Sequence, residues 1–590
     1  MTKWLLVAAL VAAAAAAAIG ATGGTQVHAF GVRLSLIDPT RALVAAGALL
    51  AIYAVFWRQR FRGDAADLAA LLRARPWTVA LALAVVAFAA ALHWGSTVAA
   101  GADSYGYVSQ AMLWRKGHLV QLEPMVDRVP WPGADRTFAP LGYRPWFASR
   151  DNIVPLYPPG LPLLMAVGQI AAGFCGAFLV VPLSGAAVVW LTFALGRRIF
   201  RSAAIGLWAA VLVGSSPIFL YQLMNPMSDV PVTAAWTLAL LLACDNRWFA
   251  CGLAMTIAVA IRPNLVPLAG VVLVWSIIRA DSPHRLRAPL LAIAGLAPAV
   301  VGVAWLNARL YGSPLLSGYG SAEGLYALEY FRTNAIRYST WLVETETPAI
   351  ALALVFFAAP RLTAPAEIGR PRFLLGATIA VVVLSYLFYL PFEAWWYLRF
   401  LVPMWPPLML ATAAAIGGVA NLVTPRFSRF VASAAIAALA WHGVDLARDR
   451  AAFTVGEREQ RYVDVARLVD SYTDQSAVVF SMQNSGSVRL YSGRLTLRYD
   501  QLESEWLDRA VEYLASIGRH PFFLLDPGEI DAFRQRFQPA SRLGALDWPP
   551  IARLRGSTAL YDPFDRDAAR IPIIVARRPT TESWPCAPAR

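Results

Sequence analysis

The amino-acid sequence predicts an α-helical polytopic membrane protein with a small extracytoplasmic α/β domain at its carboxyl end. Two observations predict the helical part. Of the 590 residues, 58 % are hydrophobic and only 15 % are charged, and apolar runs of about 20 residues, the length that crosses a bilayer, recur along the chain. The third observation is a change of composition after about residue 445, where charges become frequent and short β-like runs alternate with helical patterns.

The composition also indicates which partners are not expected. The net charge of +14 does not require nucleic acid, because the arginines stand in short clusters between apolar runs, as they do in cytoplasmic loops of membrane proteins. The four cysteines, Cys175, Cys244, Cys251 and Cys586, have no spacing typical of a zinc site or a disulfide framework. We therefore expect a membrane partner and no nucleic acid.

The arginine clusters set the expected topology, because basic loops stay cytoplasmic. Residues 1–76 form a helical hairpin and a cytoplasmic linker, and the first helix, with its basic start and small-residue end, has a signal peptide as its alternative. The transmembrane domain spans 77–445. Together they give thirteen crossings, with the amino terminus inside. The crossings are expected near residues 4–19, 42–57, 77–100, 176–195, 203–221, 230–243, 249–261, 264–278, 289–307, 348–360, 373–391, 400–420 and 430–445.

The outer side then holds the long loop at 101–157 and the α/β domain at 446–590. The apolar segment Pro158–Gly168 is expected to lie in the outer interface, because a crossing there would place Arg197 and Arg198 outside. In the α/β domain, Asp526-Pro527-Gly528-Glu529 predicts a strand-to-helix turn. The sequence predicts strands at Ala477–Ser481, Phe522–Leu525 and Ile573–Ala576 and helices at Glu457–Tyr472, Gln501–Gly518 and Glu529–Phe537.

Two carboxylates stand at the outer ends of apolar runs. Asp103 follows the run that ends near Ala100 and opens the long outer loop. A carboxylate at a membrane surface, facing a lipid-borne electrophile, can act as a general base. Asp229, in Asn225-Pro226-Met227-Ser228-Asp229, is the second acid, and we expect it to position the acceptor or assist Asp103. The alternative for both is a helix cap.

Two arginines interrupt apolar stretches on the same side. Arg262 precedes Pro263, which implies a broken helix or tight turn at the outer interface. The alternative is an arginine that snorkels to the membrane surface. Arg399 follows Trp395-Trp396-Tyr397, aromatic residues typical of an interfacial belt. A guanidinium at that depth favours a phosphate or carboxylate partner, so both arginines are candidate phosphate ligands.

The order of these motifs resembles the GT-C superfamily of membrane glycosyltransferases, which includes protein O-mannosyltransferases, glycosyltransferase family 39 and lipid A aminoarabinose transferases. The resemblance covers roughly residues 75–420. It rests on Ala102-Asp103-Ser104-Tyr105, Leu156-Tyr157-Pro158-Pro159-Gly160, Gly196-Arg197-Arg198-Ile199-Phe200, Met227-Ser228-Asp229, Ile261-Arg262-Pro263-Asn264 and Leu398-Arg399-Phe400-Leu401-Val402-Pro403. It implies an inverting transferase that uses polyprenyl-phosphate sugars on the outer face, with Asp103 as the base.

The chain departs from the family at two motifs. Ser104 follows Asp103 where protein O-mannosyltransferases have an Asp-Glu pair, which argues against protein mannosylation. Tyr157 stands where aminoarabinose transferases often have a basic residue before the two prolines. The phosphate contact there is therefore expected from Arg144 or Arg150, with Tyr157 also in the substrate site.

The sequence thus predicts a membrane glycosyltransferase, a hexosyl- or pentosyltransferase of the inner membrane. Its donor is a polyprenyl-phosphate-linked sugar and its acceptor a lipid, glycan or protein. No metal ligand is assigned, although a divalent metal is left open, and no cofactor is expected in the α/β domain, since Gly486 and Gly493 form no dinucleotide fingerprint. Two alternatives stay open: a transporter or flippase of lipid-linked sugars, and a non-catalytic scaffold for envelope assembly.

Overall fold

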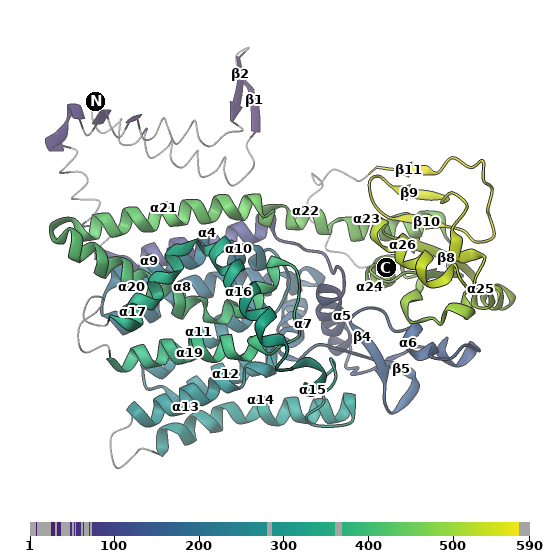
Figure 1. Ribbon diagram of the computed structural model, residues 1–590, viewed down its shortest axis with the longest axis horizontal. Coiled ribbons are helices and arrows are strands. Elements are labelled where there is room, and N and C mark those ends of the chain that lie inside the picture. The colour runs from purple at the N-terminus through teal and green to yellow at the C-terminus, as the bar shows by residue number, and fades with distance from the viewer. Residues whose placement is uncertain are drawn as a thin grey trace. The chain divides into compact units, whose positions relative to one another are not determined.

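The computed structural model describes residues 74–279, 286–359 and 369–576, together with a short β-hairpin and isolated helical residues before them (Figure 1). The chain divides into two compact units, Met1–Ala82 and Leu83–Arg590. In the first unit, strands β1 (Thr25–Ala29) and β2 (Val32–Leu36) pair antiparallel. The two crossings expected before residue 58 lie largely outside the described residues, as do Cys586 and Arg361, so the amino-terminal helical hairpin stays a prediction.

The second unit begins with a helical region that runs to residue 449. Its long helices are α4 (Pro76–Trp94, which starts in the first unit), α5 (Asp103–Arg115), α7 (Gly160–Ala172), α8 (Val180–Phe200), α9 (Ala203–Ser215), α10 (Pro217–Leu223), α11 (Asp229–Cys244), α12 (Trp248–Ile261), α13 (Pro267–Arg279), α14 (Arg287–Tyr311), α16 (Tyr330–Glu346), α17 (Leu352–Ala358), α19 (Gly369–Leu387), α20 (Trp405–Val423) and α21 (Ser428–Asp449). Short 3₁₀ segments join several of them: η2 (Phe174–Leu179), η3 (Pro263–Leu265), η4 (Pro348–Ala351), η6 (Trp395–Met404) and η7 (Pro425–Phe427).

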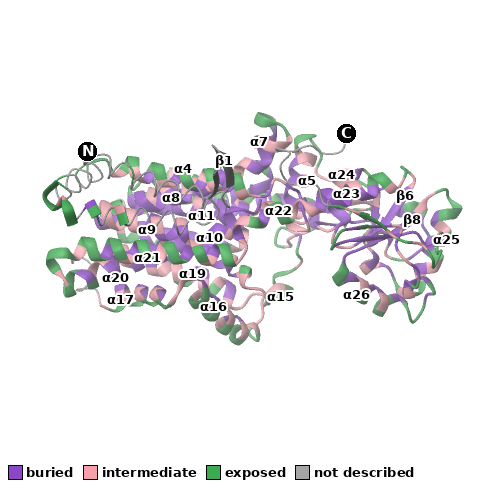
Figure 2. Ribbon diagram, turned by 90° about the horizontal axis from the view of Figure 1, so that it is seen from above, coloured by how far each residue is buried: buried purple, intermediate pink, exposed green. Residues whose placement is uncertain are grey.

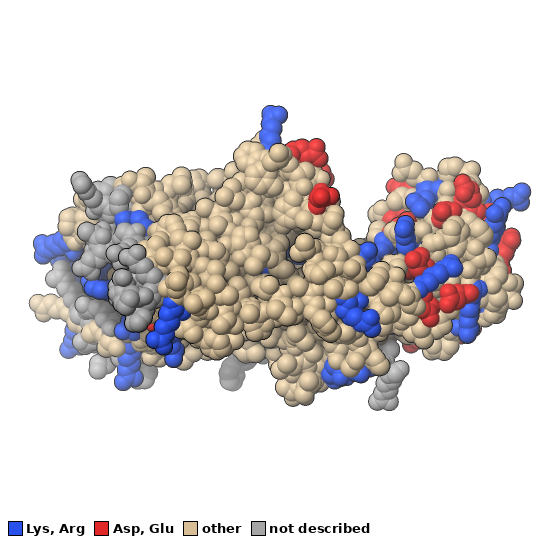
Figure 3. Space-filling view, turned by 90° about the horizontal axis from the view of Figure 1, so that it is seen from below, with Lys and Arg blue, Asp and Glu red and all other residues tan. Residues whose placement is uncertain are grey.

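Five of the described helices are long and apolar enough to cross a membrane, and there are seven such crossings if each of two bent helix pairs counts as one. Five further apolar helices have only 10–17 residues, short of the ~20 needed to cross the hydrocarbon core without help. The broad middle of the helical region is almost free of charged side chains on the face shown in Figure 3. The chain is an integral membrane protein, whereas the count of thirteen crossings stays a prediction.

Helix α20 lies at the centre of the helical region and several other helices surround it. Of the apolar window that includes α20, 94 % is buried, against 22 % for the windows of α4 and α21. Buried residues accordingly concentrate along the inner helices in Figure 2. Helices α8 and α9 approach closely through Gly196 and Gly206, where a Cβ on Gly196 would lie 2.7 Å from the Gly206 Cα. Small residues at such crossings let membrane helices pack closely.

Two of the expected crossings are broken helices. The segment expected at 203–221 bends by 63° between α9 and α10. Ser216 starts α10 there and Pro217 follows it at the first helical position, where a proline lacks only an N–H that would be unpaired in any case. The segment expected at 348–360 is η4 and α17, which meet α16 at a 111° bend. Helix α16 lies between the crossings expected at 289–307 and 348–360, where no helix was expected because polar residues interrupt the apolar pattern.

The segment 101–157 folds onto one end of the helices. Helix α5 is followed by a three-stranded sheet of order β3-β5-β4, formed by β3 (Gln121–Leu122), β4 (Tyr143–Trp146) and β5 (Ser149–Pro155), with η1 (Val126–Arg128) and α6 (Ala134–Thr137) between them. The helix expected in the interface after Pro158 is α7. Figure 1 shows α5, β4 and β5 between the helices and the carboxyl-terminal sheet.

The carboxyl-terminal part is an α/β domain built on a six-stranded sheet of order β11-β9-β10-β8-β6-β7, in which β6 pairs parallel with both β7 and β8. The expected strands are present as β6, β8 and β11, while the three-residue strands β7, β9 and β10 and helix α24 were not expected. Its strands are β6 (Ala477–Phe480), β7 (Leu495–Leu497), β8 (His520–Leu525), β9 (Ala552–Leu554), β10 (Ala559–Tyr561) and β11 (Ile573–Val575). Its helices are α22 (Val455–Glu459), α23 (Arg461–Tyr472), α24 (Ser485–Ser492), α25 (Leu507–Ser516) and α26 (Pro527–Phe537).

The expected turn between strand and helix in this domain is confirmed. Asp526 and Glu529 form a capping box at the start of α26, in which each side chain accepts from the other residue's backbone N–H. Such a box satisfies two donors that a helix start leaves without partners. It fixes the carboxyl end of β8 against the start of α26.

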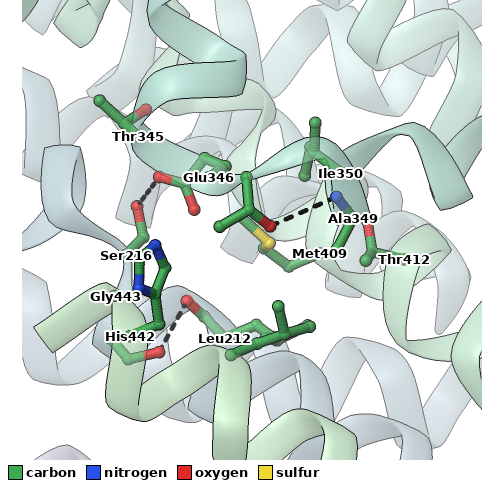
Figure 4. Close-up of a pocket in the computed structure, with 13 residues that line it drawn as sticks. Leu212, Ser216, Thr345, Glu346, Ala349, Ile350, Met409, Thr412, His442 and Gly443 are labelled. Carbon is green, nitrogen blue, oxygen red and sulfur yellow. Dashed lines mark hydrogen bonds between the residues drawn. The ribbon is translucent and has the colours of Figure 1, made fainter. Parts of the chain in front are cut away.

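The break at Ser216 is held by three hydrogen bonds. The Ser216 hydroxyl donates to Glu346 Oε1 at 2.5 Å and accepts from the indole N–H of Trp405 at 2.8 Å, and it also accepts from the backbone of Phe219. The Ser216 and Glu346 side chains line a small cavity of about 20 Å³ whose edge includes His442 (Figure 4). The hydroxyl therefore ties α10, α16 and α20 together.

We expect Ser216→Ala to lower the free energy of unfolding by about 1–3 kcal/mol, because it leaves the Trp405 N–H and the Glu346 carboxyl without this partner. The measurement is thermal unfolding of the purified protein in detergent. Ser184→Ala is the matched control, since the Ser184 hydroxyl donates only to the Val180 carbonyl of its own helix. Equal unfolding midpoints for the two variants would show that the hydrogen bonds of Ser216 do not contribute to the free energy of unfolding.

Candidate functional site

Arg399 lies in η6, a ten-residue 3₁₀ segment that leads into α20. Runs of 3₁₀ helix longer than three or four residues are uncommon. The Arg399 guanidinium lies against the rings of Tyr397 and Phe400, with its carbon 5.4 Å from each ring centroid. The two ring centroids are only 5.8 Å apart, so the rings form an aromatic surface on one side of the guanidinium.

Asp103 pairs with the Arg399 guanidinium. Its Oδ2 accepts from Arg399 Nη2 at 2.9 Å, and its Oδ1 accepts from the Tyr157 hydroxyl at 2.9 Å. Asp103 is the first residue of α5, and no side-chain cap hydrogen bond is present at this helix start. The alternative of a helix cap is therefore wrong for Asp103, whose carboxylate is bound by partners from η6 and from the turn that precedes α7.

The surroundings of Asp103 keep it ionised. Burial on its own raises the pKa of the carboxyl, but the charge of Arg399 and the hydrogen bonds from Arg399 and Tyr157 outweigh that effect. The net result is a pKa below the ordinary value of 3.8. Asp103 is thus a carboxylate at neutral pH, available to accept a proton once its present partners loosen.

Asp229 and Arg262 form a second, more deeply buried pair. Arg262 Nη2 donates to Asp229 Oδ1 at 2.6 Å and to the Ser228 hydroxyl at 3.0 Å. Asp229 is 1 % exposed and Arg262 is 9 % exposed. The broken helix expected at Pro263 is confirmed, since α12 ends at Ile261 and η3 follows. The alternative of a snorkelling arginine is wrong, because the Arg262 guanidinium is buried and paired with Asp229. The alternative of a helix cap is also wrong for Asp229, since no side-chain cap bond is present at the start of α11.

One aromatic ring joins the two pairs. The guanidinium carbons of Arg262 and Arg399 lie 5.9 Å and 5.4 Å from the centroid of the Phe400 ring. Tyr386 stacks on Phe400 at 5.1 Å, and the Asn264 amide donates to the Tyr386 hydroxyl at 3.1 Å. The four ionised groups therefore belong to one cluster with an aromatic floor, even though they come from four separate segments of the chain.

Both arginines keep buried N–H groups that lack a hydrogen-bond partner among the described residues: Nη1 of Arg262 and Nε of Arg399. Arg399 Nη1 faces the Met227 sulfur at 2.7 Å, and a thioether is a weak acceptor. Buried donors without good acceptors cost free energy, so their presence together is a reason to expect a ligand that supplies acceptors. The cluster is chemically suited to a small anion such as a phosphate.

The other candidate residues have different surroundings. Tyr157 is part of the cluster, with its ring packed at 4.4 Å against Tyr107 and at 5.8 Å against Tyr319. Arg144 instead donates to the Gly318 carbonyl at 3.2 Å and lies over Tyr311. It braces the 312–321 loop. Arg150 is exposed on β5.

Several residues of the cluster received no role from the sequence, among them Tyr107, Asn264, Tyr319 and Tyr386. Tyr107 and Asn264 stand inside or beside the quoted motifs, so the sequence indicated that they lie near the site but not what they contact. Tyr319 and Tyr386 come from segments whose aromatic residues look like interfacial ones. No local signal distinguishes them.

The described residues hold no group of three or more His, Cys, Asp or Glu side chains that could bind a metal ion. The two carboxylates of the cluster are each paired with an arginine rather than with one another. The cluster therefore offers cationic donors to an anionic group.

Comparisons with solved structures identify the fold. The chain is similar to the oligosaccharyltransferase of Archaeoglobus fulgidus in complex with an inhibitory peptide and a dolichol-phosphate, with a TM-score of 0.53, 12 % identity, and 83 % of this chain and 74 % of that one covered. The same enzyme tethered with an acceptor peptide gives a TM-score of 0.52 at 12 % identity, with 84 % of this chain and 74 % of that one covered. For ArnT from Cupriavidus metallidurans bound to undecaprenyl phosphate, the TM-score is 0.47 at 13 % identity, with 79 % of this chain and 95 % of that one covered.

No protein-family model matches the chain, and no curated protein matches it by sequence. The similarity to the archaeal oligosaccharyltransferase confirms the GT-C fold that the order of motifs implied. At this identity it concerns the fold alone.

We expect Asp229→Ala to lower the free energy of unfolding by about 3–5 kcal/mol, because removing one partner leaves the buried Arg262 charge uncompensated. The control is Asp445→Ala, which breaks a half-exposed pair with Arg448 that is worth at most about 1 kcal/mol. Thermal unfolding in detergent measures both. Similar midpoints for the two variants would contradict the assignment of Asp229 as the counter-charge of Arg262.

Proposed function

We propose that this protein is a membrane glycosyltransferase that moves a sugar from a polyprenyl-phosphate donor to an acceptor on the outer face of the membrane. The observation that supports it best is the cluster of Asp103, Asp229, Arg262 and Arg399. In it, a buried and a partly buried arginine each retain a buried N–H group without a partner among the described residues, beside an ionised carboxylate. A transferase of this kind needs cations for the phosphate and a base for the acceptor. The cluster supplies both within one site.

The donor phosphate is assigned to the two arginines. A polyprenyl phosphate is a leaving group that is already activated, so the enzyme has to hold it and stabilise the charge that develops as the bond to the sugar breaks. Nη1 of Arg262 and Nε of Arg399 are N–H donors without other partners among the described residues. Guanidinium groups suit a phosphate because their fork of N–H donors matches its oxygens.

Asp103 is the proposed general base. Its pKa below 3.8 makes it a weak base while Arg399 and Tyr157 hold it, and a base works best with a pKa near the operating pH. A phosphate bound to Arg399 competes for the same guanidinium. Each hydrogen bond that Asp103 then loses raises the pKa of its carboxyl, so donor binding and activation of the base are coupled through Arg399. Asp229 fixes Arg262, and its proposed second role is to help orient the acceptor.

The fold supports the choice of donor class. The similar structure of the archaeal oligosaccharyltransferase contains a dolichol-phosphate, which is a polyprenyl phosphate in the same chemical sense. The outer location rests on the arginine clusters, which place the Asp103 end of α4 outside. A hexosyl or pentosyl group is the unit transferred, and the acceptor is a lipid, glycan or protein.

The transporter alternative is less well supported. A carrier of lipid-linked sugars is expected to hold its substrate near the middle of the membrane, between structural repeats. Here the ionised cluster lies beside α5 and the start of α7, at the end of the helices that faces the α/β domain (Figure 1). This placement favours chemistry at the membrane surface.

We expect Asp103→Asn to leave the protein folded and to lower the transfer rate by about 10²–10⁴-fold, the usual worth of a general base. The assay follows transfer from a panel of radiolabelled polyprenyl-phosphate sugars to membrane extracts. Asp135→Asn, on the same loop but partly exposed and bonded to its neighbour's backbone, should retain the wild-type rate. Undiminished transfer by Asp103→Asn would remove the base from the proposal.

We expect Tyr157→Phe to move the acid limb of the pH–rate profile upward by up to about one pH unit. The Tyr157 hydroxyl holds the pKa of Asp103 down, so without it the carboxylate is lost at a higher pH as the solution is acidified. The control Tyr319→Phe removes a hydroxyl from a ring that packs on Tyr157. An acid limb that does not move, or moves equally in both variants, would exclude this role of Tyr157.

A further inference from the structure

The turn that leads into Asp103 is held by the α/β domain. This turn, residues 95–102, connects α4 to α5. The backbone N–H of Ala99 donates to the Tyr491 hydroxyl at 2.9 Å, and Tyr491 lies on α24 of the α/β domain. Val98 and Ala100 pack in a small apolar cluster with Tyr462, Val463 and Tyr491. The Tyr491 hydroxyl therefore binds the chain at Ala99, four residues before the proposed base Asp103.

Gly101 makes the contact still closer. Its φ of +55° lies in the left-handed region, which a residue with a Cβ adopts only with strain. A Cβ there would also lie 3.3 Å from Gln483 Nε2 and 3.4 Å from the Tyr462 hydroxyl. The turn thus fits against two side chains of the α/β domain at the residue where the chain reverses toward Asp103.

These side chains are themselves fixed at the carboxyl ends of the parallel strands β6 and β8. The Tyr462 hydroxyl accepts from Gln483 Nε2 at 2.9 Å and from Arg461 Nη2 at 2.8 Å. Arg461 pairs with Asp526 at 3.0 Å, and Glu529 accepts from the Gln483 backbone N–H at 2.9 Å. The surface that meets the turn is therefore held in place, because each of these polar groups is hydrogen-bonded within the α/β domain.

The first turn of α5 is fitted to the same domain. Tyr105 lies flat against Gly486 of α24, where any Cβ would overlap its ring. Elsewhere, the long loop 103–157 is joined to the α/β domain by separate contacts: Glu123 with Arg489, and the Arg128 carbonyl with the Tyr513 hydroxyl at 2.7 Å. These contacts hold the loop against the α/β domain without Tyr491. The hydrogen bond of Tyr491 holds only the turn at residues 95–102, which precedes Asp103.

We propose that Tyr491 is a positioning residue for the transfer reaction, which holds Asp103 in register with Arg399 by fixing the turn at Ala99. This inference rests on the proposed function, because it concerns the base of that reaction. It assigns the α/β domain a part in the site although none of its side chains between residues 450 and 576 belongs to the cluster. A displacement of about 1 Å at a reacting group can cost as much as 10²-fold in rate, so one hydrogen bond at this point is enough to matter.

The test compares Tyr491→Phe with Tyr513→Phe, which removes the other tyrosine hydroxyl that bonds across the same interface. For Tyr491→Phe we expect kcat to fall about tenfold while the KM for the donor stays within about twofold, since the arginines that hold the phosphate are on other elements. Tyr513→Phe should keep the wild-type kcat and KM. Tyr462→Phe is the second variant for the case in which Tyr491→Phe does not fold, with the same expected direction.

Hydrogen exchange of the same purified proteins adds a measurement that does not depend on the reaction. Exchange in residues 96–104 should rise in Tyr491→Phe and not in Tyr513→Phe. A wild-type kcat, a change confined to KM, or equal exchange in the two variants overturns the inference. If this happens while Asp103→Asn is inactive, the inference alone fails. A wild-type rate in Asp103→Asn overturns the proposed function and the inference together.

Discussion

The structure depends on the neutralisation of two guanidinium groups in a region that otherwise excludes charge. A buried arginine is tolerated only when it is paired and hydrogen-bonded, and here each arginine finds its carboxylate on a distant segment: Arg399 with Asp103 and Arg262 with Asp229. These pairs draw together the starts of α5 and α11, the break after α12 and the 3₁₀ segment before α20. Neither arginine is saturated by its carboxylate, so the same interactions that assemble the helix ends leave donors for an anion.

The periodicity and composition of the sequence were sufficient to predict the helical membrane region, the α/β domain and the approximate position of most of the described helices. They failed where a helix is broken or polar. The bend at Ser216 depends on hydrogen bonds to Glu346 and Trp405, residues that are far away in sequence. Helix α16 has polar residues among its apolar ones, and β7, β9 and β10 are three residues long, so none has a local pattern strong enough to be seen.

For the site, the order of motifs located all four ionised residues but not their pairing. A charge next to a proline or an aromatic run shows that something must compensate it, and the residue that does so is set by tertiary structure. Arg144 illustrates the limit. It stands in the expected loop and carries the expected charge, yet its guanidinium binds the Gly318 carbonyl. Tyr386 and Tyr319 illustrate the converse, since aromatic residues at a membrane boundary look alike in sequence whether they line a site or face lipid.

The most direct test of this account is the affinity of the purified protein for a polyprenyl phosphate without its sugar, measured for the wild type, Arg262→Gln and Arg399→Gln. Charge-assisted hydrogen bonds from two arginines to one phosphate predict that each substitution weakens binding at least about tenfold. Replacement of Arg144 by Gln should leave the affinity unchanged. Equal affinity in the wild type and in both cluster variants would contradict the assignment of the cluster as a phosphate site.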